Sequence, residues 1–184
     1  MGPLTAFAVR PVGVRFETQE AQEQVMLFLR QHMIVNVPWA VLAIVLLMVP
    51  SVLFPFALGL FKLPFVLPMG YVIIGTLFWY IAIFGFVLGN FLGWFFNIYI
   101  VTNQRIIDID FIHLLYKQFS EAQVSRIQDI SYRTKGLLPT VFDFGDVAIQ
   151  TAGELPNFHF DRVPHPDKVV DTVGDLAKKY KKNL

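Results

Sequence analysis

One long stretch of the chain is almost free of charge. Residues 33–104, 72 in all, contain a single charged side chain, Lys62, whereas residues 1–32 contain 6 and residues 105–184 contain 22. About 20 consecutive apolar residues are enough to cross the hydrocarbon core of a bilayer as a helix. The stretch is therefore long enough for two spans, and it separates a membrane part from a part suited to water.

The uncharged stretch predicts a transmembrane hairpin over residues 33–94, with helices at about 34–58 and 69–94 and a connection near Lys62. Of the 15 Lys and Arg residues, 14 lie outside this connection, on the side of both termini. The positive-inside rule assigns such a side to the cytoplasm. We therefore expect a multi-pass protein of the plasma membrane with both termini cytoplasmic. The alternative is a hairpin buried in a soluble protein.

Three glycines recur every four residues in the second helix, Gly85, Gly89 and Gly93, and Asn90 lies beside them. Glycines at this spacing form a groove that lets another helix approach closely, and an amide can hydrogen-bond across it. The helix that packs there is either the first helix, which we favour, or one from a second copy. The predicted spans contain no acidic or basic side chain, which a transport path would require.

The segment 1–32 precedes the hairpin and is predicted as an arm followed by an amphipathic helix. Thr18 can cap a helix over residues 19–32, whose apolar side chains Ala21, Val25, Phe28 and Leu29 share one face. Such a helix could lie at the membrane interface or pack on the soluble part.

Residues 95–184 are predicted as a small β domain closed by a helix. Strands are expected near 97–101, 107–111, 114–119, 126–133, 147–151 and 158–160, a loop over 136–139, and an amphipathic helix from about 166. In the second strand Asp108 and Asp110 alternate with isoleucines and are expected on a solvated face. The fold class is α+β: a transmembrane hairpin followed by an antiparallel sandwich or barrel with a C-terminal helix.

Several blocks in this part resemble bacterial pleckstrin-homology-like (PH-like) membrane proteins. The blocks lie in the expected order at residues 99–107, 126–131, 136–138, 144–149 and 151–153. The hairpin ahead of the domain matches too, so the resemblance covers roughly residues 20–175. It implies a seven-stranded sandwich capped by a helix, of which six strands are plain in the sequence. It implies neither catalytic activity nor an established ligand.

Composition and motifs exclude most chemistry. The chain has no cysteine, and its four histidines lack metal-ligand spacing, so no metal, cofactor or catalytic residue is assigned. The net charge of +1 gives no attraction to nucleic acid. Eukaryotic PH domains bind inositol phosphates through an early basic loop, but the turn at 102–105 offers only Arg105. We therefore expect a protein that is not an enzyme.

Basic side chains are the remaining candidates for contact with anionic lipid headgroups. They are Lys178, Lys179, Lys181 and Lys182 near the C-terminus, and Arg126, Arg133 and Lys135 around the fourth strand. Each could add about 1 kcal/mol of attraction to an anionic membrane, whereas lysines at a helix C-terminus also complement its dipole. The expected partners are membrane lipids and a protein partner or a second copy. The favoured function is a scaffold or adaptor; the alternative is a subunit of a transport or secretion complex.

Overall fold

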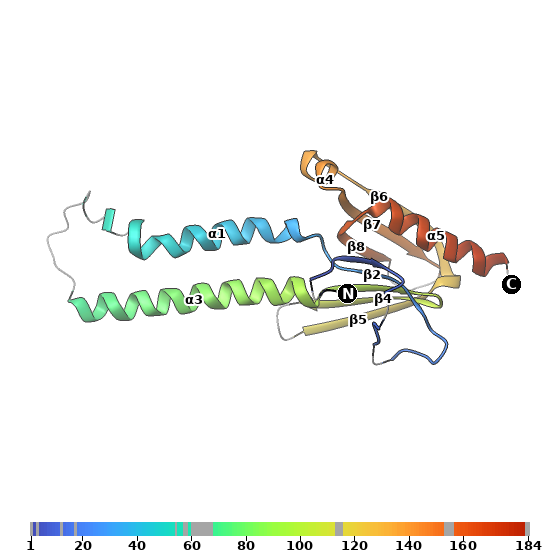
Figure 1. Cartoon of the computed structure of the whole chain (residues 1–184), viewed down its shortest axis with the longest axis horizontal. Helices are drawn as coiled ribbons and strands as arrows, with labels where there is room; N and C mark the ends of the chain where they lie inside the picture. Colours follow the sequence, from blue (N-terminus) through green and yellow to red (C-terminus); the bar gives the residue numbers. More distant parts are fainter. Residues whose placement is uncertain are drawn as a thin grey trace. The chain divides into compact units, whose positions relative to one another are not determined.

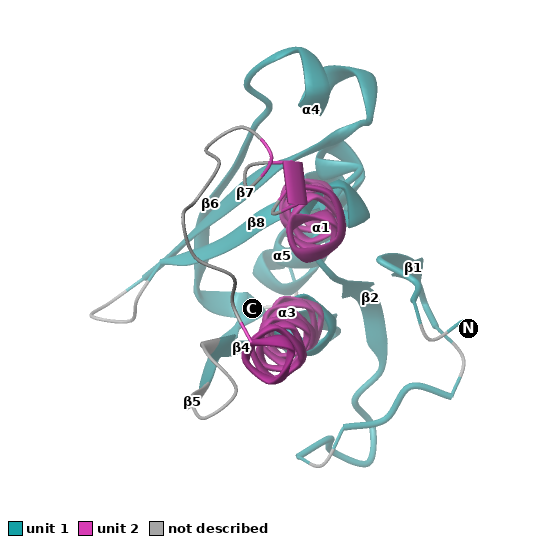
Figure 2. Cartoon of the chain, turned by 90° about the vertical axis from the view of Figure 1, so that its left-hand side faces the viewer, with its two compact units in different colours: residues 1–35, 93–184 teal, residues 36–92 magenta. Residues whose placement is uncertain are grey.

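Figure 1 shows a computed structural model of the chain. It describes residues 2, 4–11, 13–16, 18–53, 55–56, 59, 68–112, 116–152 and 157–182. The chain forms two compact units (Figure 2): residues 1–35 with 93–184, here called the domain, and residues 36–92, here called the helical unit. The domain is thus built from two pieces of sequence on either side of the apolar stretch.

Two long apolar helices account for most of the uncharged stretch. The first is η1 (Met33–Asn36), α1 (Val37–Met48) and η2 (Val49–Leu53) in unbroken succession, and the second is α3 (Met69–Phe96). They are 21 and 28 residues long, and only 6% of the most apolar window of each is buried. A core helix of a soluble protein would bury far more of such a surface. The predicted connection near Lys62 lies outside the described residues.

A proline modifies the end of the first apolar helix. Pro50 has no N–H, so the carbonyl of Leu46, four residues earlier, loses its usual α-helical donor. The backbone N–H of Val49 donates to this carbonyl, and so does the indole N–H of Trp79 from α3, at 2.9 Å. Side-chain donors of this kind are what make proline tolerable in apolar helices.

The domain consists of two antiparallel sheets. The first has the order β1 (Phe7–Val9), β2 (Val25–Leu29), β3 (Ile98–Thr102), β4 (Arg105–Ile112) and β5 (Tyr116–Gln123). The second has the order β6 (Ile127–Arg133), β7 (Phe144–Thr151) and β8 (Phe158–Pro164). The short turn η3 (Val124–Arg126) joins the sheets, and α5 (Pro166–Lys182) follows β8. The expected sandwich with a C-terminal helix is therefore present.

The main core lies between the sheets and α5. Its fully buried members include Leu27 of β2, Val101 of β3, Ile149 of β7, Phe160 of β8 and Val169 of α5. The ring of Tyr99 stacks on that of Phe160, with centroids 4.5 Å apart. Residues from both sides of the apolar stretch thus share one core.

The helix predicted over residues 19–32 is wrong, because the structure has strand β2 there. Both faces of β2 are covered: Leu27 and Leu29 face the main core, while Val25 and Phe28 belong to a second cluster on the outer face of the sheet. The register slips between Val25 and Leu27. This bulge puts the outward residues three apart, a spacing that imitates the period of a helix.

The solvated face expected for Asp108 and Asp110 is also wrong. The alternating isoleucines Ile107 and Ile109 lie in the outer cluster, covered by residues of the N-terminal arm. Asp108 lies opposite Tyr99, so the aspartates face the interior of the sandwich. Both faces of β4 are covered, and the alternation of apolar and acidic residues along the strand does not reveal this.

The loop expected over residues 136–139 contains a single helical turn, α4 (Leu137–Val141). Gly136 has a φ of 104°, a conformation that favours glycine, and it starts the turn. Both the backbone N–H and the hydroxyl of Thr140 donate to the carbonyl of Gly136. These bonds close the turn between β6 and β7.

We predict that Leu27→Ala lowers the free energy of unfolding of the domain by about 2–5 kcal/mol, because it leaves a cavity in the main core. Val9→Ala, at a position 54% exposed on neighbouring β1, should change it by less than about 0.5 kcal/mol. Urea-dependent proteolysis of the full chain in detergent measures both. Equal stability of the two variants would mean that the N-terminal segment is not part of the core.

Candidate functional site

The domain has two distinct ends. At one end, which we call the exit end, the chain passes between the domain and the apolar helices. The indole N–H of Trp94 donates to the carbonyl of Gln31 at 2.8 Å, so the two passages are side by side. The backbone N–H of His32 donates to Arg162, and its ring stacks on Phe144 with centroids 5.2 Å apart. The other end, which we call the far end, holds the β3–β4 turn, η3 and the last turns of α5.

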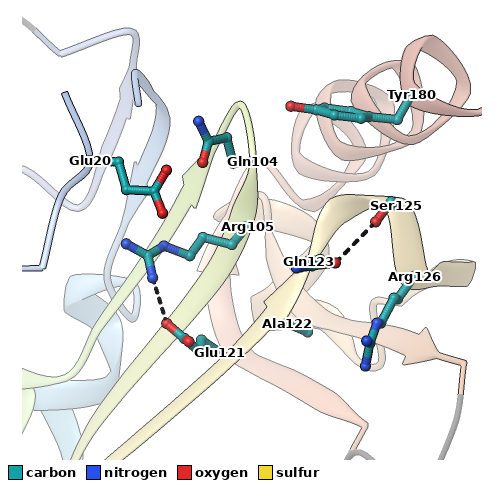
Figure 3. Close-up of a pocket in the computed structure, with 9 residues that line it drawn as sticks. All are labelled: Glu20, Gln104, Arg105, Glu121, Ala122, Gln123, Ser125, Arg126 and Tyr180. Carbon is teal, nitrogen blue, oxygen red and sulfur yellow. Dashed lines mark hydrogen bonds and ion pairs between the residues drawn. The ribbon is translucent and has the colours of Figure 1, made fainter. Parts of the chain in front are cut away.

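An open groove of about 740 Å³ lies at the far end (Figure 3). Its lining includes Arg105 of β4, Glu121 of β5, Arg126 of η3, Tyr180 of α5 and Glu20. The groove therefore combines charges of both signs with one aromatic side chain, and it lies where the two sheets and α5 meet.

Arg105 in this groove is held by a network of carboxylates. Its Nε donates to Oε1 of Glu23 at 3.0 Å, and its Nη1 donates to Oε2 of Glu121 at 2.8 Å. The hydroxyl of Thr102 also donates to Glu23, at 2.7 Å. Burial alone would raise the pKa of Glu23, but the hydrogen bonds from Arg105, Thr102 and the backbone of Glu20 outweigh it and lower the pKa. The charge of Arg105 is thus neutralised within the domain.

The described lining of the groove includes Ser125, which has the type of side chain that can act as a nucleophile. The hydroxyl of Ser125 donates to the amide oxygen of Gln123 at 3.5 Å, and no histidine lines the groove to activate it. Over the described residues, no group of three or more His, Asp or Glu side chains is placed to bind a metal ion.

Three carboxylates lie near Tyr99: the partly buried Asp108 and Asp110 on the inward face of β4, and the exposed Asp161 of β8. Burial, followed by repulsion from Asp110 and Asp161, raises the pKa of Asp108 to about 7. Burial and repulsion from Asp161 also raise the pKa of Asp110. The hydroxyl of Tyr99 accepts a hydrogen bond from the backbone N–H of Asp161, and burial raises the pKa of this tyrosine too. Sequence reasoning missed the cluster because it placed these aspartates in solvent.

The basic side chains predicted to contact lipid divide into two groups. Helix α5 packs on η3, and Tyr180 and Arg126 line the same groove. The first group, Lys178, Lys179, Lys181, Lys182 and Arg126, is therefore at the far end. Arg133 and Lys135 lie at the other end of β6, next to α4. The seven residues of β6 separate the groups by about 20 Å, so they form two separate basic sites rather than one patch.

The predicted helix-packing residues lie on α3. A Cβ added to Gly85, Gly89 or Gly93 would meet nothing within 4 Å beyond its own helix. The amide of Asn90 donates to the carbonyl of Phe86, four residues earlier in the same helix. Among the described residues, then, an added Cβ at these three positions would have open space around it, and which helix packs there stays a prediction.

Comparison with known proteins agrees with this architecture. The family model described as Bacterial PH domain matches residues 25–183. The chain belongs to the bacterial PH domain family. No curated protein and no solved structure matches it.

Within this bacterial PH domain protein the family match begins at Val25, the first residue of β2. Besides the three-residue β1, the described residues form seven strands in two sheets, the number that the resemblance implies. Six of them follow the apolar helices, and the seventh is β2. The strand that sequence reasoning could not find thus precedes the apolar helices in the sequence rather than following them.

We predict that Asp108→Asn stabilises the domain at pH 8, by on the order of 1–3 kcal/mol once partial solvent screening is allowed for. The folded domain holds a proton on Asp108 up to about pH 7, whereas the unfolded chain releases it near the ordinary value of 3.8. Between these values the folded state binds more protons, so wild-type stability falls as pH rises.

The asparagine variant lacks this loss, so its advantage should shrink steadily as the pH is lowered from 8 to 5. Urea unfolding at several pH values measures it. The control is Asp171→Asn, at an exposed position of α5, which should follow the wild type. A pH-independent difference between wild type and Asp108→Asn would contradict the assignment.

Proposed function

We propose that this protein is an integral membrane protein that holds its PH-like domain at the cytoplasmic face of the plasma membrane. In this proposal the domain acts without catalysis, as a scaffold or adaptor for a protein partner or for lipid headgroups. The observation that carries the proposal is the pairing of β2 with β3, in which Leu29 lies opposite Tyr99. The two apolar helices lie between these paired strands in the sequence.

The strand pairing limits how the apolar helices can be used. If they crossed a bilayer an odd number of times, β2 and β3 would be on opposite sides and could not pair. Two crossings return the chain to the side where it started. Cleavage of the first helix as a signal sequence would remove β2 and open the core around Leu27. A membrane hairpin is compatible with both the exposed apolar helices and the shared sheet, and this supports the proposal.

The far-end groove supports a role in binding rather than catalysis. The far-end groove has its arginine paired with Glu23 and Glu121, and its serine lacks an activating base among the described lining residues. A small domain fixed to a membrane raises the local concentration of whatever it binds, and this is the mechanism of a scaffold. Net charge of +1 favours no nucleic-acid partner.

Topology can be tested by single-cysteine labelling, because the natural chain contains no cysteine. We predict that Lys62→Cys, between the two apolar helices in the sequence, reacts with an impermeant maleimide added to intact cells. Thr172→Cys on α5 should react only after the membrane is permeabilised.

Labelling of both positions in intact cells would contradict a cytoplasmic domain. Release of the protein from membranes by alkaline carbonate would contradict integration. Phe84→Cys, in the middle of α3, serves as the internal control and should resist the reagent in both conditions.

A second proposal concerns the unoccupied glycine row on α3. Because nothing within 4 Å meets a Cβ at Gly85, Gly89 or Gly93, we propose that a helix of another chain packs there. That chain is a second copy of this protein or, if the protein is a subunit of a transport or secretion complex, a different subunit. Close backbone approach at such a row is a common basis of helix association in membranes.

We predict that Gly89→Ile reduces the size of the assembly extracted in a mild detergent, because the branched side chain fills the groove. Phe84→Ile changes a residue on a different face of the same helix, 66% exposed, and should leave the assembly intact. Light scattering coupled to size-exclusion chromatography measures both. An unchanged size with Gly89→Ile would mean that the row does not mediate assembly.

A further inference from the structure

The end of β6 and the turn between β6 and β7 carry exposed apolar side chains, here called the α4 patch. It consists of Tyr132, Leu137, Leu138, Val141 and Phe142, which are 49–86% exposed. The other large apolar side chains exposed on the domain outside the apolar helices, Leu4, Val9 and Phe119, lie apart from it in the sequence. Single exposed apolar residues are ordinary, whereas a contiguous group of them marks an interaction surface.

Cations accompany the α4 patch. Arg133 and Lys135 precede α4, and residues 133–142 contain no acidic side chain. Asp143, the next residue, pairs with His165, and Asp146 on β7 accepts a hydrogen bond from the backbone of Arg162. Apolar side chains flanked by cations match the chemistry of a membrane surface, where anionic headgroups lie above hydrocarbon.

The α4 patch also lies at the exit end of the domain. Phe142 is two residues from Phe144, whose ring stacks on His32, and the first apolar helix begins at residue 33. Three extended residues span at most about 10 Å, so Val141 is within this distance of Phe144 along the chain. In Figure 1, α4 extends beyond the strands at the end of the domain where β6 finishes and β7 starts.

Part of the backbone of α4 is hydrogen-bonded within the turn. The N–H groups of Thr140 and Phe142 donate to the carbonyls of Gly136 and Leu138, and the hydroxyl of Thr140 also donates to Gly136. Pro139 has no N–H to satisfy. A segment that enters lipid must pair its polar backbone groups internally, and this turn pairs several of them.

We propose that α4 inserts into the same bilayer that the two apolar helices cross, with its leucines and Val141 in the outer hydrocarbon and Arg133 and Lys135 among anionic headgroups. This inference rests on the proposed membrane anchoring and adds a third contact to it. With the two chain passages at the exit end, α4 fixes the orientation of the domain on the membrane. The far-end groove is then presented away from the bilayer, toward partners in the cytoplasm.

Single-cysteine variants of the full chain, each labelled with an environment-sensitive fluorophore in vesicles containing anionic lipid, test the proposal. The positions are Leu138→Cys on α4, Phe84→Cys on α3 and Thr172→Cys on α5. Quenching by lipids that carry a nitroxide near the headgroup or near the chain end reports depth. An interfacial segment is buried about 5–10 Å, so Leu138→Cys should shift to the blue and lose most of its emission to the shallow quencher.

The control positions separate the possible failures. Phe84→Cys should be quenched best by the deep nitroxide, and Thr172→Cys by neither. If Phe84→Cys is quenched and Leu138→Cys behaves as in water, the insertion of α4 is wrong while the membrane anchoring stands. If Phe84→Cys is not quenched, the anchoring itself is wrong. Protection of Leu138→Cys in native membranes alone would assign the patch to a protein partner and overturn the proposal.

The cations are tested by paired substitutions. Arg133→Gln with Lys135→Gln should reduce the quenching of the fluorophore at Leu138→Cys in anionic vesicles. Lys178→Gln with Lys179→Gln removes the same amount of charge at the far end and should leave the quenching at Leu138→Cys unchanged. If both pairs of substitutions reduce the quenching equally, the effect reflects net charge alone. That result would overturn the assignment of Arg133 and Lys135 to headgroups.

Discussion

The pairing of β2 with β3 is the interaction on which the rest of the structure depends. It places Leu29 opposite Tyr99 and Val25 opposite Thr102, and it brings together two segments that the whole apolar stretch separates. The shared core cannot close around Leu27 until both segments are present, so the domain folds only after the apolar stretch between them has been synthesised. Contacts of such large sequence separation are the slow ones in folding. The apolar stretch is in effect a long insertion between two neighbouring strands.

Much of the domain could be predicted from the sequence, but β2 could not, for a local physical reason. The strands after residue 97 alternate or follow clear turns, and α5 has one apolar face, so their periods identify them. In β2 the bulge after Val25 breaks the alternation, and both faces are covered. A short, continuously apolar run with that spacing fits a helix as well as a strand. Only the partner strand, Ile98–Thr102, decides between them.

The same omission explains the misplaced aspartates and limits what the sequence could say about sites. Without β2 and the arm before it, the isoleucine face of β4 looked like the core face and Asp108 like a surface residue. With them in place, Ile107 lies beneath the arm and Asp108 faces Tyr99. Charge alone was enough to identify the basic residues as candidates for lipid contact. Their division into two groups depends on the direction of α5 relative to β6, and the spacing of residues in the sequence does not reveal that direction.

The two ends of the domain differ because the segment before β2 is attached to the sheet by an ion pair at one end only. At the far end, Glu23 precedes β2 and its fully buried carboxylate binds Arg105 across the β3–β4 turn. Arg105, the one basic residue of this turn, therefore binds the N-terminal segment through Glu23. An anion could bind Arg105 only by competing with Glu23 and Glu121. At the exit end, Arg133 and Lys135 make none of the ion pairs seen among the described residues, and apolar side chains lie exposed beside them. Basic side chains thus lie at both ends of the domain, but among the described residues exposed apolar side chains accompany them at the exit end, whereas those at the far end lie beside a mixed-charge groove.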